Sequence, residues 1–260
     1  MLRPRIIPCL LVHQGGLVKT QVFKTPKYVG DPINAVKIFN EKEADELMVL
    51  DIDATVLGRE PDYSLISKMA NECRMPFCYG GGVTKVVQAM RIIAMGVEKV
   101  AVSSAVIANP QLLTEISAAI GRQSVVAVLD VRKKKGLLQK DFEVCTHNAT
   151  IAYKKDPIEL AIHLQEAGAG EIVVNAVDRD GLMQGFDLEM GLEFRRALKV
   201  PLTILGGAGT LDDISEIFVK VGMVGAAAGS LFVFKGKYRA VLINYPTPKQ
   251  KEKFKSVEKI

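Results

Sequence analysis

Carboxylates that end apolar runs are the residues of this sequence best placed to do chemistry. Asp130 closes the run Val125–Asp130. A carboxylate at the end of a strand that opens into a cavity suits general acid–base catalysis. Asp51 and Asp180 lie near the ends of two other runs, where a carboxylate can also cap a helix or pair with a cation. We therefore predict Asp130 as the catalytic group, with Asp51 and Asp180 as accessory candidates.

Two glycine clusters follow two further runs, and each has a serine at the same distance. The first glycine of each cluster precedes its serine by 24 positions (80 to 104 and 206 to 230). Glycine lets a phosphate oxygen approach bare backbone N–H groups. One isolated pair would more often form a tight turn, but two matched clusters favour two sites for a substrate that is anionic at both ends. The predicted phosphate-binding residues are Gly81, Gly82, Ser104, Gly206, Gly207, Gly229 and Ser230.

The elements that position these residues alternate along the chain. Amphipathic stretches separate short apolar runs, and Asp31-Pro32, Asn109-Pro110 and Asp156-Pro157 each supply an N-cap acceptor followed by a proline suited to the first helical position. Parallel strands need such crossovers. The eight predicted strands are Arg5–Val12, Leu47–Ile52, Pro76–Tyr79, Lys99–Val102, Val125–Asp130, Glu171–Val174, Pro201–Leu205 and Gly225–Gly229.

Eight such units predict an α/β fold, a (βα)8 TIM barrel, built as two half-barrels that repeat the same glycine and serine positions. The length of 260 residues is usual for one barrel. A doubly wound sheet would be expected to show three spaced glycines after its first strand, and Gly15-Gly16 lack the third. We expect residues 1–245 to form the barrel and residues 246–260 to form a flexible basic tail.

Composition excludes several classes of protein. The net charge of +5 comes with lysine runs that lack interleaved aromatic residues, so we expect no nucleic-acid partner. No apolar run is long enough for a signal or a membrane span, and four cysteines show no zinc spacing. We expect a cytoplasmic protein with free thiols, no metal and no cofactor.

The sequence resembles the cyclase subunit of imidazole glycerol phosphate synthase from its start to about Phe234. The resemblance is carried by Arg5–Leu10, Gly168–Ile172, Asp178–Gly181 and Gly206–Gly209 together with the first glycine cluster. It implies a glutaminase subunit that docks on the N-terminal face of the barrel. Ammonia would then pass through the core to the opposite rim, where a phosphoribosyl-carboxamide substrate is cyclised and cleaved.

The resemblance also implies a gate for ammonia at the base of the barrel. The family forms this gate from a salt-bridged ring, and the matching residues here are Arg5, Glu46, Lys99 and Glu171. Four alternating charges at strand starts also make physical sense, because an unpaired charge on the barrel axis would be costly. A plug against water is a compatible interpretation of the same ring.

The catalytic rim departs from the family. Its members use an acid–base pair of aspartates, and this chain keeps Asp130 but has Leu11 at the other position. A leucine has no titratable proton, so acid–base work there is lost unless a neighbour such as His13 replaces it. Three more rim positions differ from the usual asparagine, threonine and serine, and hold Ser103, Asn175 and Leu205.

The C-terminal segment also differs, because Pro246 and Pro248 prevent one helix from running through them. With Leu11, this ending resembles a specialised branch whose members serve acetamidino modification of surface-polysaccharide sugars alongside a glutaminase and a sugar amidotransferase. We therefore expect an amidotransferase-linked enzyme of this branch. A true histidine-pathway cyclase and a non-catalytic scaffold that conducts ammonia remain the alternatives.

Overall fold

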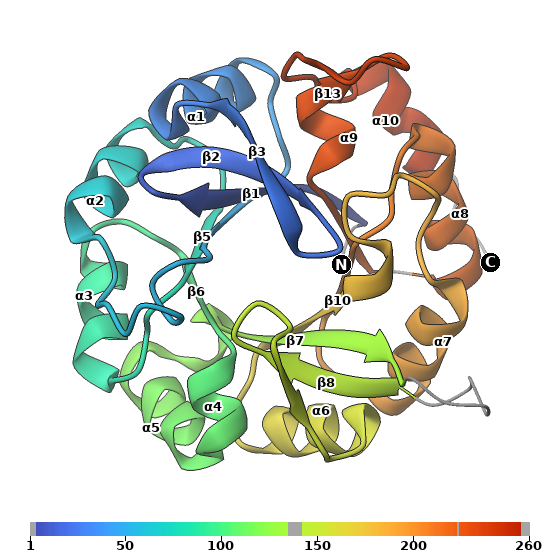
Figure 1. The fold of residues 1–260 in the computed structure, drawn as a ribbon. Coiled ribbons are helices and arrows are strands. Elements are labelled where there is room, and N and C mark those ends of the chain that lie inside the picture. Colours follow the sequence, from blue (N-terminus) through green and yellow to red (C-terminus); the bar gives the residue numbers. More distant parts are fainter. Residues whose placement is uncertain (1–3, 135–141, 223, 256–260) are drawn as a thin grey trace.

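The computed structural model describes residues 4–134, 142–222 and 224–255, and at its centre is a closed ring of eight parallel strands (Figure 1). Each strand pairs with the next, and a pairing of the last with the first closes the ring. This confirms the predicted (βα)8 barrel. In ring order the strands are β1 Arg5–His13, β4 Leu47–Asp51, β5 Phe77–Gly80, β6 Lys99–Val102, β7 Val125–Lys133, β10 Glu171–Ala176, β11 Leu202–Leu205 and β12 Gly225–Ala228.

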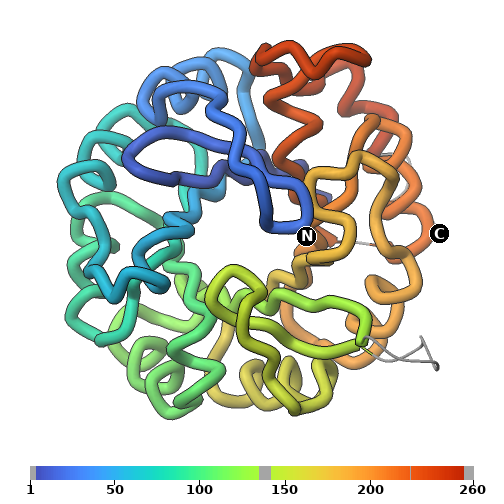
Figure 2. Tube along the Cα trace, in the orientation of Figure 1, coloured from blue at the N-terminus to red at the C-terminus, as the bar shows by residue number. Residues whose placement is uncertain are grey.

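Helices surround the ring, and the chain passes once around it from its N-terminal to its C-terminal part (Figure 2). Within the described residues, no helix has the length and apolar character needed to cross a membrane. The helices are α1 Pro32–Glu41, α2 Tyr63–Glu72, α3 Val86–Ala94, α4 Ser104–Ala108, α5 Pro110–Ile120, α6 Pro157–Glu166, α7 Leu188–Ala197, α8 Leu211–Val221, α9 Ser230–Val233 and α10 Pro248–Lys255, and 3₁₀ turns span Arg122–Ser124 and Val177–Arg179.

Alternation along each strand divides the core into two parts. Side chains on one face, such as Ile6 and Val100, pack against the helices. Those on the other face, such as Ile7, Met48 and Val126, fill the inside of the barrel. Because a strand turns successive side chains to opposite faces, this division follows from the strand register.

Two of the three predicted helix starts form as expected. Asp31 accepts a hydrogen bond from the backbone N–H of Asn34, and Asp156 accepts from those of Ile158 and Glu159. Asn109 precedes the helix that begins at Pro110, but its side chain makes no capping hydrogen bond. The proline fixes the start of that helix without the cap.

Two hairpins at the carboxyl ends of the strands were not predicted. β2 Gly16–Gln21 and β3 Lys24–Gly30 form an antiparallel pair after β1, and β8 Phe142–Thr146 and β9 Ile151–Tyr153 form another after β7. Both extend over the barrel end (Figure 1). They therefore bring residues of two loops to the mouth of the barrel.

Within residues 246–260, the segment predicted as a flexible basic tail, the structure places the helix α10. Pro248 begins this helix, and Phe254 packs edge-on against Phe218 of α8 with ring centroids 5.7 Å apart. Lys251 of the same helix pairs with Asp45 at 2.7 Å, so an aromatic contact and an ion pair join the segment to the barrel. β13 Phe234–Lys235 and β14 Ala240–Val241 form a short hairpin between α9 and α10. Residues 256–260 lie outside the described part.

Tyr245 joins this C-terminal segment to the first strand, and we expect its hydroxyl to stabilise the fold. The hydroxyl donates to the carbonyl oxygen of Ile6 at 2.8 Å and accepts from the N–H of Asp45 at 3.0 Å. Tyr245→Phe leaves both buried backbone groups without this partner, so the free energy of unfolding should fall by about 1–3 kcal/mol in denaturant titrations. The control Tyr238→Phe changes a side chain that is 84% exposed and should have no measurable effect. Equal stability of the two variants would contradict the structural role of Tyr245.

Candidate functional site

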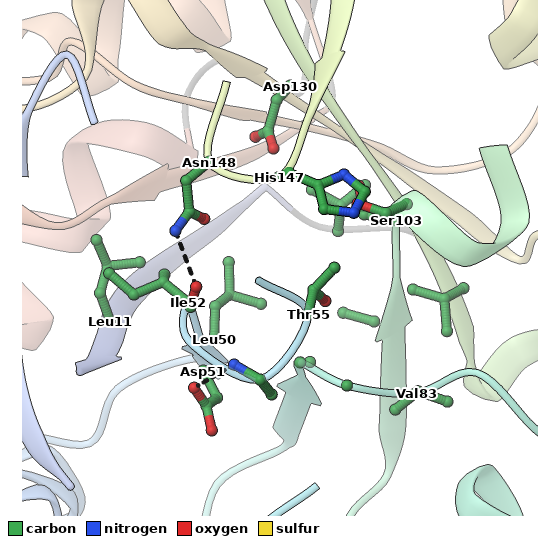
Figure 3. Close-up of a pocket in the computed structure, with 18 of the residues that line it drawn as sticks. Leu11, Leu50, Asp51, Ile52, Thr55, Val83, Ser103, Asp130, His147 and Asn148 are labelled. Carbon is green, nitrogen blue, oxygen red and sulfur yellow. Dashed lines mark hydrogen bonds between the residues drawn. The ribbon is translucent and has the colours of Figure 1, made fainter. Parts of the chain in front are cut away.

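A cavity of about 690 Å³ opens at the carboxyl ends of the strands (Figure 3). Asp130 enters it from β7, which continues beyond the predicted end at Asp130 to Lys133, and Leu11 lines it from β1. The three rim positions that differ from the family, Ser103, Asn175 and Leu205, also line it. The structure thus brings together the predicted catalytic group and the rim positions that the resemblance singled out.

Asp130 has the properties of an acid–base group. The side-chain amide of Asn175 donates to its carboxylate at 2.9 Å, and burial raises the pKa of Asp130 to about 6. A carboxyl group with a pKa near neutrality can both give and take a proton at physiological pH. Position and chemistry therefore agree for this residue.

The accessory candidates are placed differently. Asp51 lines the cavity but accepts from the N–H groups of Asp53 and Ala54, so it also holds the turn after β4. Asp180 lines the cavity and accepts from the hydroxyl of Thr20 at 2.7 Å. Burial raises the pKa of both Asp51 and Asp180.

His13 is not among the residues that line the cavity. Its Nδ1 atom lies 2.7 Å from the carboxylate of Asp53, which also accepts from the N–H of Gln14. The ring is therefore engaged in fixing the end of β1. The structure does not bring His13 to Asp130 as a replacement for an acid at position 11.

The first predicted phosphate cradle is open to the cavity. Gly81, Gly82 and Ser104 all line it. Both glycines have positive φ angles, and a Cβ atom on Gly81 would lie 2.6 Å from the carbonyl oxygen of Asp51. Only glycine fits that conformation in that space, so the backbone itself requires glycine here, and this requirement is separate from the predicted role in phosphate binding.

The second cradle is only partly open. Gly229 lines the cavity, but Gly206, Gly207 and Ser230 are not among its lining residues. The loop after β10 covers Gly207, where the N–H of Gly185 donates to the carbonyl oxygen at 2.9 Å. The matched glycines thus occupy equivalent places in the two halves but differ in access to the cavity.

Sequence reasoning missed residues that the two hairpins bring into the cavity. Lys19 of β2 is buried there, where its ammonium donates to the carbonyl oxygen of Cys9 and burial lowers its pKa. His147 and Asn148 come from the turn between β8 and β9. The only available signal was a polar turn between two β-rich runs, which does not reveal where the turn lies.

At the opposite end of the barrel, the four predicted gate residues form a closed ring of ion pairs. The ammonium of Lys99 lies 2.8 Å from Glu46 and 2.9 Å from Glu171. The guanidinium of Arg5 pairs with the same two carboxylates. Burial alone would raise the pKa of Glu171, but Arg5 and Lys99 outweigh it and hold this pKa at about 2.

Metal ligands are not visible in this arrangement. Over residues 4–134, 142–222 and 224–255, no group of three or more His, Cys, Asp or Glu residues could hold a metal ion. The four cysteines are free, and Cys9 and Cys78 lie among the apolar residues inside the barrel. The mouth of the barrel holds Asp130, a group suited to acid–base chemistry.

Comparison with known proteins agrees with this geometry. The profile of the family described as histidine biosynthesis protein matches residues 5–239. A Vibrio vulnificus protein provisionally named imidazole glycerol phosphate synthase subunit hisF3 is 57% identical over 253 residues, which cover 97% of this chain and 96% of that protein. A Pseudomonas aeruginosa protein provisionally named subunit hisF2 is 49% identical over 95% of this chain and 97% of its own length.

A relative with a firm name is more distant. The imidazole glycerol phosphate synthase subunit HisF of Exiguobacterium sibiricum is 38% identical over 89% of this chain and 91% of that protein. The fold and the comparisons together define a (βα)8 barrel of the histidine biosynthesis class. Within that class, the chain belongs to the HisF family of imidazole glycerol phosphate synthase subunits.

The ion-pair ring predicts a large cost for removing one charge. Lys99→Met leaves two buried carboxylates sharing one guanidinium, so the free energy of unfolding should fall by about 3–5 kcal/mol. The control Lys37→Met removes an exposed pair with Glu72 at 3.6 Å, which should cost about 1 kcal/mol or less. Denaturant titration of both variants measures the difference, and a similar small loss in both would show that solvent screens the ring.

Because Asp130 is buried, replacing it with a neutral residue should stabilise the protein, and the size of this effect should depend on pH. Because its pKa is raised to about 6, the folded chain keeps a proton that the unfolded chain releases at about pH 4, and folding weakens as the pH rises through this interval. Asp130→Asn should therefore raise the free energy of unfolding at pH 8 by about 1–3 kcal/mol, with the gain lost below about pH 4. A variant less stable than the wild type at pH 8 would contradict the raised pKa.

Proposed function

We propose that this chain is a synthase subunit that takes ammonia from a glutaminase partner and uses it at the mouth of the barrel, in a reaction that serves amidino modification of surface-polysaccharide sugars. The observation that carries the proposal is the combination of an intact ion-pair ring at one end with an altered acid–base pair at the other. Arg5, Glu46, Lys99 and Glu171 retain the ring. Leu11 lines the cavity at the position where the resemblance implies a second catalytic aspartate.

The ring supports a partner that delivers ammonia at the N-terminal face. It lies at the base of β1, β6 and β10, on the axis of the barrel. Above it the interior holds small or apolar side chains, such as Cys9, Ala101 and Ala227. Such a lining favours neutral ammonia over ammonium or water, because a charge inside it would be poorly solvated. The relatives named above are called subunits, which supports a second chain in the assembly.

The residues at the mouth of the barrel favour an enzyme over a chain that only conducts ammonia. Asp130 lies inside the cavity with a pKa of about 6, and the first glycine cluster lines one wall. A chain that only conducted ammonia would have no use for a buried carboxyl group with a raised pKa, which costs stability. Asp130→Asn should therefore abolish product formation under either enzyme proposal.

Leu11 supports a specialised reaction. It enters the cavity from β1, where family members have their other catalytic aspartate, and packs against the apolar interior. A second candidate is the histidine-pathway cyclase itself, favoured by the retained Asp130 and by 38% identity to the Exiguobacterium sibiricum protein. The two candidates differ in whether the wild-type chain turns over the histidine-pathway substrate at full rate.

Restoring the missing acid separates these candidates. Leu11→Asp should raise residual cyclase turnover by about 10²–10⁴, the usual contribution of one general acid or base. The assay supplies the purified chain with ammonium salt and the histidine-pathway substrate, and Leu50→Asp is the control for a carboxylate placed elsewhere in the same cavity. Full turnover by the wild-type chain, or its complementation of a histidine auxotroph, would favour the second candidate.

A further inference from the structure

We propose that His147 is the second acid–base group of this cavity and acts with Asp130 from the turn of the β8–β9 hairpin. The proposal rests on the proposed function in one respect, namely that the cavity is where the reaction takes place. Acid–base chemistry in one turnover commonly needs one group to accept a proton and another to donate one. Leu11 cannot supply the second group, and His13 is held by Asp53 outside the cavity.

The hairpin runs back along β7 and brings His147 to the level of Asp130. β8 is antiparallel to β7, and Asp130 pairs with Cys145, two residues before His147. Both Asp130 and His147 line the cavity with Ser103. Figure 3 shows the imidazole pointing into the cavity, with Leu11 on the other side of it. The histidine thus enters from the loop side and not from the first strand.

The turn that presents His147 is held in an unusual conformation. His147, Asn148 and Ala149 have φ angles of 53°, 55° and 60°, which non-glycine residues rarely adopt. Two hydrogen bonds fix it: the hydroxyl of Thr150 donates to the carbonyl oxygen of His147 at 2.6 Å, and the amide of Asn148 donates to that of Ile52 at 2.9 Å. Backbone strain that the surroundings maintain is concentrated at functional sites.

The surroundings of the ring are suited to a ligand. Nδ1 of His147 lies 3.1 Å from the hydroxyl of Thr146, which leaves Nε2 as the nitrogen that can exchange a proton with a ligand. Within the described structure, the hydroxyl of Ser103 and the amide oxygen of Asn175 are buried and have no hydrogen-bond partner. Buried polar atoms are nearly always paired in proteins, so these two are placed to meet a polar ligand.

The pair can carry an amination with balanced protons. Ammonia adds to a carbonyl carbon of the substrate. As the nitrogen–carbon bond forms, imidazole Nε2 removes one proton from nitrogen and protonated Asp130 gives its proton to the carbonyl oxygen, which yields a carbinolamine. Protonated His147 then gives its proton to the hydroxyl group, the carbon–oxygen bond breaks to release water, and the Asp130 carboxylate takes a second proton from nitrogen. The product is an imine and water, and both groups return to their starting states without an oxidant or reductant.

A double-mutant comparison tests whether His147 does the work that an acid at position 11 would do. His147→Gln should lower kcat for the residual cyclase turnover by about tenfold or more, with KM changed less than about threefold. In the Leu11→Asp background the same substitution should lower kcat by less than about threefold, because the aspartate supplies the proton transfer. Equal losses in the two backgrounds would indicate a structural role and overturn the proposal.

The matched control is His163→Gln, because His163 lies exposed on α6 and the chain has only three histidines. It should leave kcat unchanged in both backgrounds. His147→Gln should also remove one limb of the pH profile of kcat, whereas a loss from misfolding would scale the whole profile down.

A measurement without turnover keeps the test separate from the proposed function. In ¹⁵N-imidazole NMR spectra at one fixed pH, Asp130→Asn should shift the Nε2 resonance of His147 and leave that of His163 unchanged, because only His147 shares the cavity with Asp130. An unchanged His147 resonance would overturn the proposal. Absence of turnover with and without Leu11→Asp would count against the proposed function, and the NMR comparison alone then decides on His147.

Discussion

Four charged side chains meet at the base of the barrel, and none could be buried there without the other three. Arg5, Lys99, Glu46 and Glu171 come from separate parts of the chain, yet the two cations each pair with both carboxylates. An unpaired charge at this depth would cost several kcal/mol, so the strands must keep the register that closes the ring. The ring therefore ties the strand register at the base of the barrel to the pairing of these four charges.

The opposite end of the barrel has the reverse character. Burial raises the pKa of Asp51, Asp130 and Asp180 there, and the hydroxyl of Ser103 lacks a hydrogen-bond partner within the described structure. The two ends of the barrel therefore differ: the charges at the base are paired with one another, whereas polar groups at the mouth are left for a ligand. A small neutral nitrogen compound admitted at the base would reach groups that can transfer its protons.

The sequence predicts the barrel well because its signals are local. Strand β6 has the predicted bounds Lys99–Val102, and the caps at Asp31 and Asp156 depend on residues within one helical turn. Asp130 and the gate residues were predicted from strand ends and from the family resemblance. Lys19 and His147 were missed because hairpin packing over the mouth is a tertiary property. The helix α10 was missed because its contacts, Phe254 with Phe218 and Lys251 with Asp45, are made with residues far away in the sequence.

An isotope competition measures the central claim, passage of ammonia through the barrel, most directly. The chain is combined with the proposed glutaminase partner and the proposed sugar amidotransferase, amide-¹⁵N glutamine and an excess of unlabelled ammonium salt. Passage through the barrel predicts that the nitrogen added to the product keeps the ¹⁵N content of the glutamine amide. Dilution of the label to the isotope ratio of the bulk ammonium would contradict the account.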